Sequence, residues 1–151
     1  MSLRPRRRLP IAPTAPESVR NQPLLDSPRP IDLATTPSLA VFEITLACDL
    51  GCRHCGSRAG KARPDELSTE ECLDLIDQFA DLGVAEVALI GGEAYLRDDW
   101  CQIIRRVKDR GMSPIMTTGG RNMTLERATQ AAEAGLDSAS VSIDEIGRAH
   151  V

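Results

Sequence analysis

Three cysteines within eight residues offer the clearest chemistry in this chain. Cys48, Cys52 and Cys55 follow a Cys-x3-Cys-x2-Cys spacing. A [4Fe–4S] cluster is usually held by four cysteine thiolates, so three ligands from one loop would leave one iron without a protein ligand. An open metal position of this kind can bind a small molecule and do chemistry on it. The spacing therefore indicates a cluster with one iron open to a further molecule.

Other uses of these cysteines fit the residue types less well. A zinc site could take His54, or a residue from elsewhere, as its fourth ligand. However, His54 adjoins Cys55, and four tetrahedral ligands from so short a loop would be cramped. A disulfide framework is disfavoured because the chain has five cysteines and nothing marks it as secreted. Cys72 and Cys101 fall on expected helices and are interpreted as packing residues.

The order of the motifs resembles the radical S-adenosylmethionine (radical SAM) superfamily over about residues 38–144. The cysteine motif is followed by Gly91-Gly92-Glu93 and then by Ser142-Ile143-Asp144. The resemblance implies that Cys48, Cys52 and Cys55 ligate a [4Fe–4S] cluster and that S-adenosyl-L-methionine (SAM) chelates the open iron. It implies reductive cleavage of SAM to a 5′-deoxyadenosyl radical, which abstracts hydrogen from an unknown substrate, a peptide or a small molecule. The layout is most similar to SPASM/twitch-type members that modify peptides or haem-related molecules.

The resemblance also implies which side chains contact SAM. His54 would stack near the adenine, and Glu93 would accept a hydrogen bond from the methionine ammonium group. Gly91 and Gly92 would allow close approach of the backbone, and Ser142 would contact the carboxylate or the ribose. Two positions depart from the family pattern, since Ala94 replaces the usual proline and Thr118-Gly119 lacks the usual asparagine. Asp144 is interpreted either as a substrate-side group or as a turn residue.

Strand and helix patterns alternate along the chain and predict an α/β fold of parallel (βα) repeats. Ser68 and Glu71 form a capping-box pattern, Thr124 is the expected N-cap of the last helix, and Gly83 and Gly135 mark helix ends. The pattern alone is compatible with a barrel or a doubly wound sheet, and the resemblance implies about four strands of a (βα)6 partial TIM barrel. Every motif falls at a strand's C-terminal end, where ligands bind in both folds. We expect strands over 38–46, 84–90, 112–117 and 138–143, and helices from 69, over about 98–110 and over 125–134.

The N-terminal segment differs in composition from the rest of the chain. Residues 1–37 hold eight of the ten prolines, which predicts a disordered or extended arm, either dispensable or a docking arm for a partner. The Arg6-Arg7-Arg8 cluster has no apolar h-region after it, so the cytoplasm is the expected location. The acidic remainder argues against nucleic acid as a partner, and no apolar run approaches the ~20 residues of a membrane span. The resemblance implies an electron donor such as flavodoxin or ferredoxin.

Residues 145–151 do not continue the alternating pattern. They resemble one reading frame of a sequencing adapter, so we expect a non-native tail and a gene cut short near Asp144. The last strands of a partial barrel would then be missing, and this chain could itself be inactive. Two other functions remain open at this point. One is an iron–sulfur electron carrier or sensor without SAM chemistry, and the other is a zinc-binding module.

Overall fold

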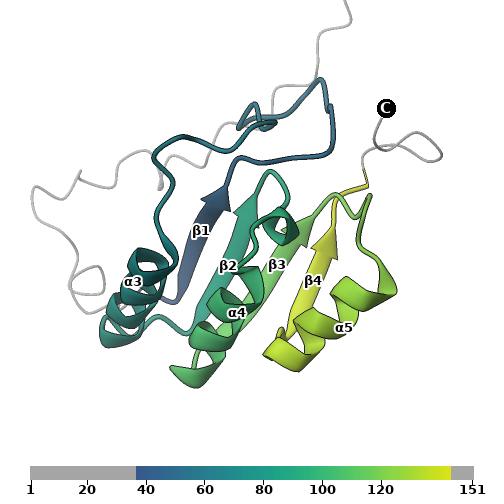
Figure 1. Cartoon of the computed structure of the whole chain (residues 1–151). Coiled ribbons are helices and arrows are strands. Elements are labelled where there is room, and N and C mark those ends of the chain that lie inside the picture. Colours follow the sequence, from purple (N-terminus) through teal and green to yellow (C-terminus); the bar gives the residue numbers. More distant parts are fainter. Residues whose placement is uncertain (1–36, 144–151) are drawn as a thin grey trace, which may run out of the picture. The chain divides into compact units, whose positions relative to one another are not determined.

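The computed structural model describes residues 37–143 (Figure 1). The expectations for the N-terminal arm, for Asp144 and for residues 145–151 concern residues outside this range. None of the helices in the described part is both long and apolar enough to cross a membrane.

Four parallel strands form one sheet in the order β1-β2-β3-β4, so each strand pairs with its neighbour in sequence. Figure 1 shows the α-helices α3, α4 and α5 on the same face of this sheet. A doubly wound sheet would reverse its strand order and carry helices on both faces. The arrangement is therefore that of a barrel segment. The strands are β1 (Leu39–Thr45), β2 (Glu86–Gly91), β3 (Ser113–Thr118) and β4 (Ser138–Val141), and the helices are α3 (Thr69–Asp81), η1 (Ala94–Leu96), α4 (Trp100–Asp109) and α5 (Leu125–Ala134).

The core lies between the helices and the strand side chains that face them. Alternate residues of a strand point to the same face, and those of β1 to β3 that face the helices are buried or partly buried. Cys72 on α3 is fully buried and Cys101 on α4 packs against the same cluster, which confirms the packing interpretation of both. The largest contributors are Phe42, Ile44, Ile76, Val87, Leu89, Trp100, Ile103, Ile104, Val107 and Met116.

The opposite face of the sheet is not covered by helices of the described chain. Val41 pairs with Ala88, which in turn pairs with Ile115, so these residues share that face. Val41 is 59% exposed and Leu39, two residues earlier, is 48% exposed. In a barrel this is the inner face.

The helix ends follow from the residues predicted to form them. Ser68 caps α3 in a complete capping box with Glu71, and Thr124 caps α5. Gly83 and Gly135 adopt positive φ angles of 81° and 96° after these helices, a conformation that costs glycine little.

The boundaries of the four strands and of α4 differ from the sequence-based expectation by one or two residues. The last helix before β3 begins at Trp100 rather than near 98, because residues 97–99 follow the short η1 helix. η1 itself was not predicted. β4 ends at Val141 rather than at 143, since its partner β3 ends at Thr118, directly opposite Val141.

Candidate active site

The loop between β1 and α3, residues 46–68, is called the cysteine loop here. It lies at the C-terminal ends of the strands (Figure 1). Cys48, Cys52 and Cys55 all line one pocket of about 380 Å³. All three are free thiols and partly buried. The structure thus brings the three predicted metal ligands to a common cavity.

Two backbone amides of the loop donate hydrogen bonds to these sulfur atoms. The N–H of Leu50 lies 3.4 Å from Cys48 Sγ, and the N–H of Ala59 lies 3.3 Å from Cys55 Sγ. Arg58, with a φ of 52°, turns the chain just before Ala59. Hydrogen bonds of this kind help to set the potential of an iron–sulfur cluster.

Burial raises the pKa of the Cys48 thiol, and the charges of Glu93 and Asp49 add to this effect against the Leu50 hydrogen bond. A thiol in such surroundings stays protonated unless positive charge is supplied. Metal coordination supplies that charge and deprotonates a bound thiol. The environment of Cys48 therefore suits a metal ligand better than a free nucleophile.

The base of the cysteine loop is closed by hydrogen bonds to the end of β1. Gly60 N donates to Leu46 O at 2.8 Å, and Cys48 N donates to Gly60 O at 3.1 Å. Glu66 Oε1 accepts from Thr45 Oγ1, Leu46 N and a third amide, that of Arg63. Burial opposes ionisation of Glu66, but these bonds outweigh it and lower its pKa. The carboxylate holds both ends of the loop together.

Gly91 and Gly92 lie where the end of β2 meets the cysteine loop. A Cβ at Gly91 would lie 2.4 Å from the carbonyl oxygen of Thr45, and one at Gly92 would lie 2.2 Å from that of Ala47. The amides of Gly92 and Glu93 donate to the same two carbonyls. The glycines are therefore required by contact with the end of β1 and the start of the cysteine loop, and their predicted approach to SAM stays a prediction.

The substitution Gly92→Ala is expected to lower the free energy of unfolding by about 1–3 kcal/mol. The added Cβ would collide with the backbone of Ala47, so one of the two backbone segments would have to move. Urea unfolding followed by circular dichroism measures the change. Gly60→Ala is the matched control, since no atom lies within 4 Å of a Cβ there. Equal stability of the two variants would contradict this account.

Glu93 is buried beside the cysteine loop, with 1% of its surface exposed. Its Oε2 accepts from Thr118 Oγ1 at 2.5 Å, and its Oε1 accepts from Gly119 N at 2.6 Å. One ligand atom each of Cys48, Asp49 and Glu93 lie within 4.8 Å of one another. The Thr118-Gly119 pair, for which the sequence predicted no contact, thus orients this carboxylate next to the first cysteine.

His54 and Ser142 are placed near this site, but their predicted contacts with SAM stay predictions. His54 is an exposed residue of the cysteine loop and is not among the residues that line the cysteine pocket. Ser142 follows β4, and its N–H donates to Thr118 O at 2.9 Å. This bond holds Ser142 at the C-terminal ends of the strands, where Glu93 also lies.

A buried ion pair that sequence reasoning missed braces the outer side of the site. Arg97 donates two hydrogen bonds of 2.7 Å to Asp99 and further bonds to the carbonyl oxygens of Ile44 and Leu67. Thr69 Oγ1 also donates to Asp99. The side chains of the pair are only 12% and 11% exposed. The signal available in the sequence was position alone, because both residues closely follow Gly-Gly-Glu.

The substitution Asp99→Asn is expected to lower the free energy of unfolding by about 3 kcal/mol near pH 7, because it leaves Arg97 buried without its counter-charge. The hydrogen bonds from Arg97, opposed by burial, lower the pKa of Asp99 in the folded state. Its contribution is therefore complete above the unfolded pKa of about 4 and is lost as pH falls through the lower folded value. Urea titrations of both proteins from pH 7 to pH 3 should show the difference shrinking below pH 4. A stability difference that does not change with pH would contradict a contribution from the Arg97–Asp99 ion pair.

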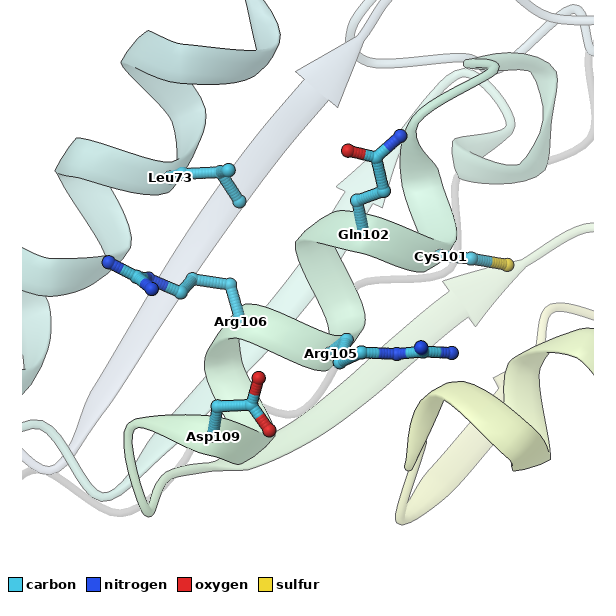
Figure 2. A pocket seen from close by; sticks show the side chains of 6 residues that line it. All are labelled: Leu73, Cys101, Gln102, Arg105, Arg106 and Asp109. Atoms are coloured by element: carbon cyan, nitrogen blue, oxygen red, sulfur yellow. The ribbon is translucent and has the colours of Figure 1, made fainter.

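A second pocket, of about 360 Å³, opens on the helix layer between α3 and α4 and is shown in Figure 2. Leu73 lines it from α3 and Cys101 from α4, with Arg106 engaged by Asp77. This pocket is lined by helix residues and by none of the strand-end motifs. It is not a candidate active site.

The comparisons with known proteins agree with this geometry. The sequence profile of the Radical SAM superfamily matches residues 42–150, and the chain belongs to this superfamily of enzymes. Among similar curated proteins are an AdoMet-dependent heme synthase of Nitratidesulfovibrio vulgaris, 34% identical over 124 residues, and the mycofactocin maturase MftC of Mycobacterium tuberculosis, 34% identical over 108 residues. The matches cover 81% and 72% of this chain but 34% and 28% of the relatives. The chain thus spans about a third of their length.

Solved structures show the same fold. BtrN, solved in complex with AdoMet and 2-DOIA, superposes with a TM-score of 0.63 at 20% identity, covering 77% of this chain and 49% of BtrN. Streptococcus suis SuiB, solved with its precursor peptide SuiA, gives 0.62 at 19% identity, covering 72% of this chain and 25% of SuiB. These neighbours are partial TIM barrels, and the four strands described above are part of such a barrel.

Radical SAM enzymes use a [4Fe–4S] cluster and SAM, and the cysteine loop fits the cluster. Its three thiols share one pocket and two of them accept amide hydrogen bonds. The chain's two other cysteines lie on α3 and α4, within the helix layer. Three thiols are therefore available as donors in one pocket, and their ligation of a cluster stays a prediction.

Proposed function

We propose that this protein binds a [4Fe–4S] cluster through Cys48, Cys52 and Cys55 and cleaves SAM reductively to abstract hydrogen from its substrate. The observation that carries the proposal is the cysteine pocket with the buried Glu93 carboxylate beside it. The cluster, when bound, would supply the electron that breaks a carbon–sulfur bond of SAM. The residues of the chain hold and orient the reactants.

Glu93 has the properties of an amine-binding group. Thr118 and Gly119 fix its orientation, and a charged amine beside a fixed, buried carboxylate makes a strong, charge-assisted contact. The sulfur atom of Cys48 lies within 4.8 Å of a carboxylate oxygen of Glu93. An amino acid bound to the open iron through its amino and carboxylate groups would therefore have the N–H groups of its coordinated amine within reach of Glu93.

The substrate we propose is a peptide or a haem-related small molecule. Names and titles of similar proteins support this range, since they include heme synthases, mycofactocin maturases and a structure with a bound precursor peptide. The uncovered face of the sheet, with Val41 and Ile115, is the inner face of a barrel and is mostly apolar at its centre. An apolar inner surface suits either class of substrate.

The reducing partner we propose is a small acidic redox protein such as a flavodoxin or ferredoxin. Arg53 and Arg58 line the cysteine pocket and are exposed, so the loop presents positive charge to an approaching donor. We propose a cytoplasmic location because free, only partly buried thiols stay reduced in that compartment. The acidic composition of the described part gives no support for nucleic acid as a partner.

Anaerobic reconstitution of the full-length protein tests the proposal. Iron and sulfide are added, followed by SAM and dithionite, and 5′-deoxyadenosine is measured by chromatography. We expect a brown protein that forms 5′-deoxyadenosine. A brown protein that forms none would indicate an electron carrier or sensor, and a colourless protein that retains zinc would indicate a binding module.

A further inference from the structure

We propose that Asp49, Tyr95 and Asn122 form a positioning group that fixes the cysteine loop against the turn after β3. The geometry of the cluster, and with it the reduction potential and the response to SAM, would depend on this group. The inference rests on the proposed function for its link to SAM. None of the three residues is a cluster ligand in the arrangement described above.

The three side chains come from separate segments and meet at one carboxylate. The Tyr95 hydroxyl lies 3.3 Å from each carboxylate oxygen of Asp49, and the Asn122 side-chain amide donates to the same carboxylate at 2.5 Å. Asn122 N donates to the Tyr95 hydroxyl, and Arg121 donates to the carbonyl oxygen of Asp49 at 2.8 Å. The residue between the first two cysteines is therefore held through both its side chain and its backbone.

Tyr95 is a rigid support for this contact. It lies in η1, immediately after Ala94, and is only 3% exposed. The Arg127 guanidinium lies 4.6 Å above its ring and also donates to Asn122 O. Burial, with the nearby charges of Glu93 and Asp49, raises the pKa of Tyr95 to about 12. The phenol therefore stays a hydrogen-bond donor over the physiological pH range.

The held residue is adjacent to the atoms that would contact the cluster. Asp49 lies between Cys48 and Leu50, whose amide donates to Cys48 Sγ. A change in the backbone at Asp49 would move this donor, and hydrogen bonds to sulfur are one of the main influences on cluster potential. Removing the Tyr95 hydroxyl would thus change the cluster potential indirectly, through the backbone of the cysteine loop.

The same turn also orients Glu93. Gly119 N donates to Glu93, and Asn122, three residues later, holds Asp49. The turn after β3 therefore supports the cluster side and the proposed SAM side together. Loosening Asn122 should alter how the cluster responds to SAM, although Asn122 is placed in contact with neither.

The test compares Tyr95→Phe and Asn122→Ala with wild type and with Gln102→Ala. The last variant removes an exposed side-chain amide on α4, away from the cysteine loop. Each full-length protein is reconstituted anaerobically, and iron content, the midpoint potential of the cluster and its electron paramagnetic resonance spectrum with and without SAM are measured. Melting of each apoprotein, followed by circular dichroism, reports the fold.

We expect both test variants to keep the fold, to show a shifted midpoint potential, and to need about tenfold more SAM for the same spectral change, as for a lost hydrogen bond to a charged group. Gln102→Ala should match wild type. Test variants that also match wild type in potential and SAM response would overturn the inference. If Tyr95→Phe unfolds, the exposed Asn122 decides the outcome alone. The two hypotheses can fail separately, because the midpoint potential is measured without SAM. Wild-type protein that loads a cluster but does not cleave SAM would overturn the proposed function. The midpoint potentials of the variants would still test the inference.

Discussion

Replacing any one of Cys48, Cys52 and Cys55 with serine is expected to abolish cluster binding and lower 5′-deoxyadenosine formation more than about 100-fold. Outer residues around metal sites already cost 10- to 100-fold when removed, and here a direct ligand would be lost. The three thiols line one pocket, so two of them would hold the cluster too weakly to keep it during purification. Iron and sulfide content and visible absorption measure the loss.

The matched control is Cys101→Ser. Cys101 is partly buried on α4, and burial raises the pKa of its thiol. It lines the pocket of the helix layer shown in Figure 2. This variant should bind the same amount of iron as wild type. Iron loss from Cys101→Ser, or full iron content in the Cys52→Ser variant, would show that the ligands have been assigned wrongly.

The second large effect is expected from Glu93→Gln, which should weaken SAM binding by roughly 10- to 100-fold. Hydrogen bonds to charged groups contribute about 1.5–3 kcal/mol, and the substitution removes the charge of Glu93 while keeping its size. The glutamine oxygen can still accept from Gly119, and its amide can donate to the Thr118 hydroxyl. The cluster should therefore still load. SAM titration followed by electron paramagnetic resonance gives the dissociation constant.

Glu70→Gln is the control for this variant, since Glu70 is an exposed carboxylate in the first turn of α3. It should leave SAM binding unchanged. Glu93→Gln with wild-type affinity and a full cluster would exclude Glu93 from SAM recognition. Loss of the cluster itself would instead indicate that Glu93 supports Cys48 and not the cofactor.

The sequence was sufficient for the element order and for the three cysteines that share a pocket, because both depend on local patterns. Apolar periodicity and the caps Ser68 and Thr124 located the helices, and the cysteine spacing located the candidate ligands. The choice of a barrel segment over a doubly wound sheet depended on which face the helices cover. The covered face depends on the crossover connections between strands and not on any one segment. Before the structure, only the family resemblance indicated a barrel segment.

The supporting contacts could not be predicted because their partners are far apart in the chain. Asp49 and Asn122 are 73 residues apart, and Arg97 meets the carbonyl oxygen of Ile44 across 53 residues. In their local sequence, Asp49, Arg97 and Asn122 look like ordinary polar loop residues. Gly91 and Gly92 were identified, but their reason was not, since the colliding carbonyls at Thr45 and Ala47 lie in the preceding strand and loop.

The contacts between Gly92 and the end of β1 limit where the length of this chain can vary. Hydrogen bonds from Gly92 and Glu93 reach Thr45 and Ala47, and Gly60 pairs on the other side of the same segment. One inserted residue before Cys48 would break both sets. Residues 61–65 are exposed, and loops of this kind accept insertions at a small entropic cost. Length differences among proteins with this loop should therefore collect after the third cysteine and be rare before the first.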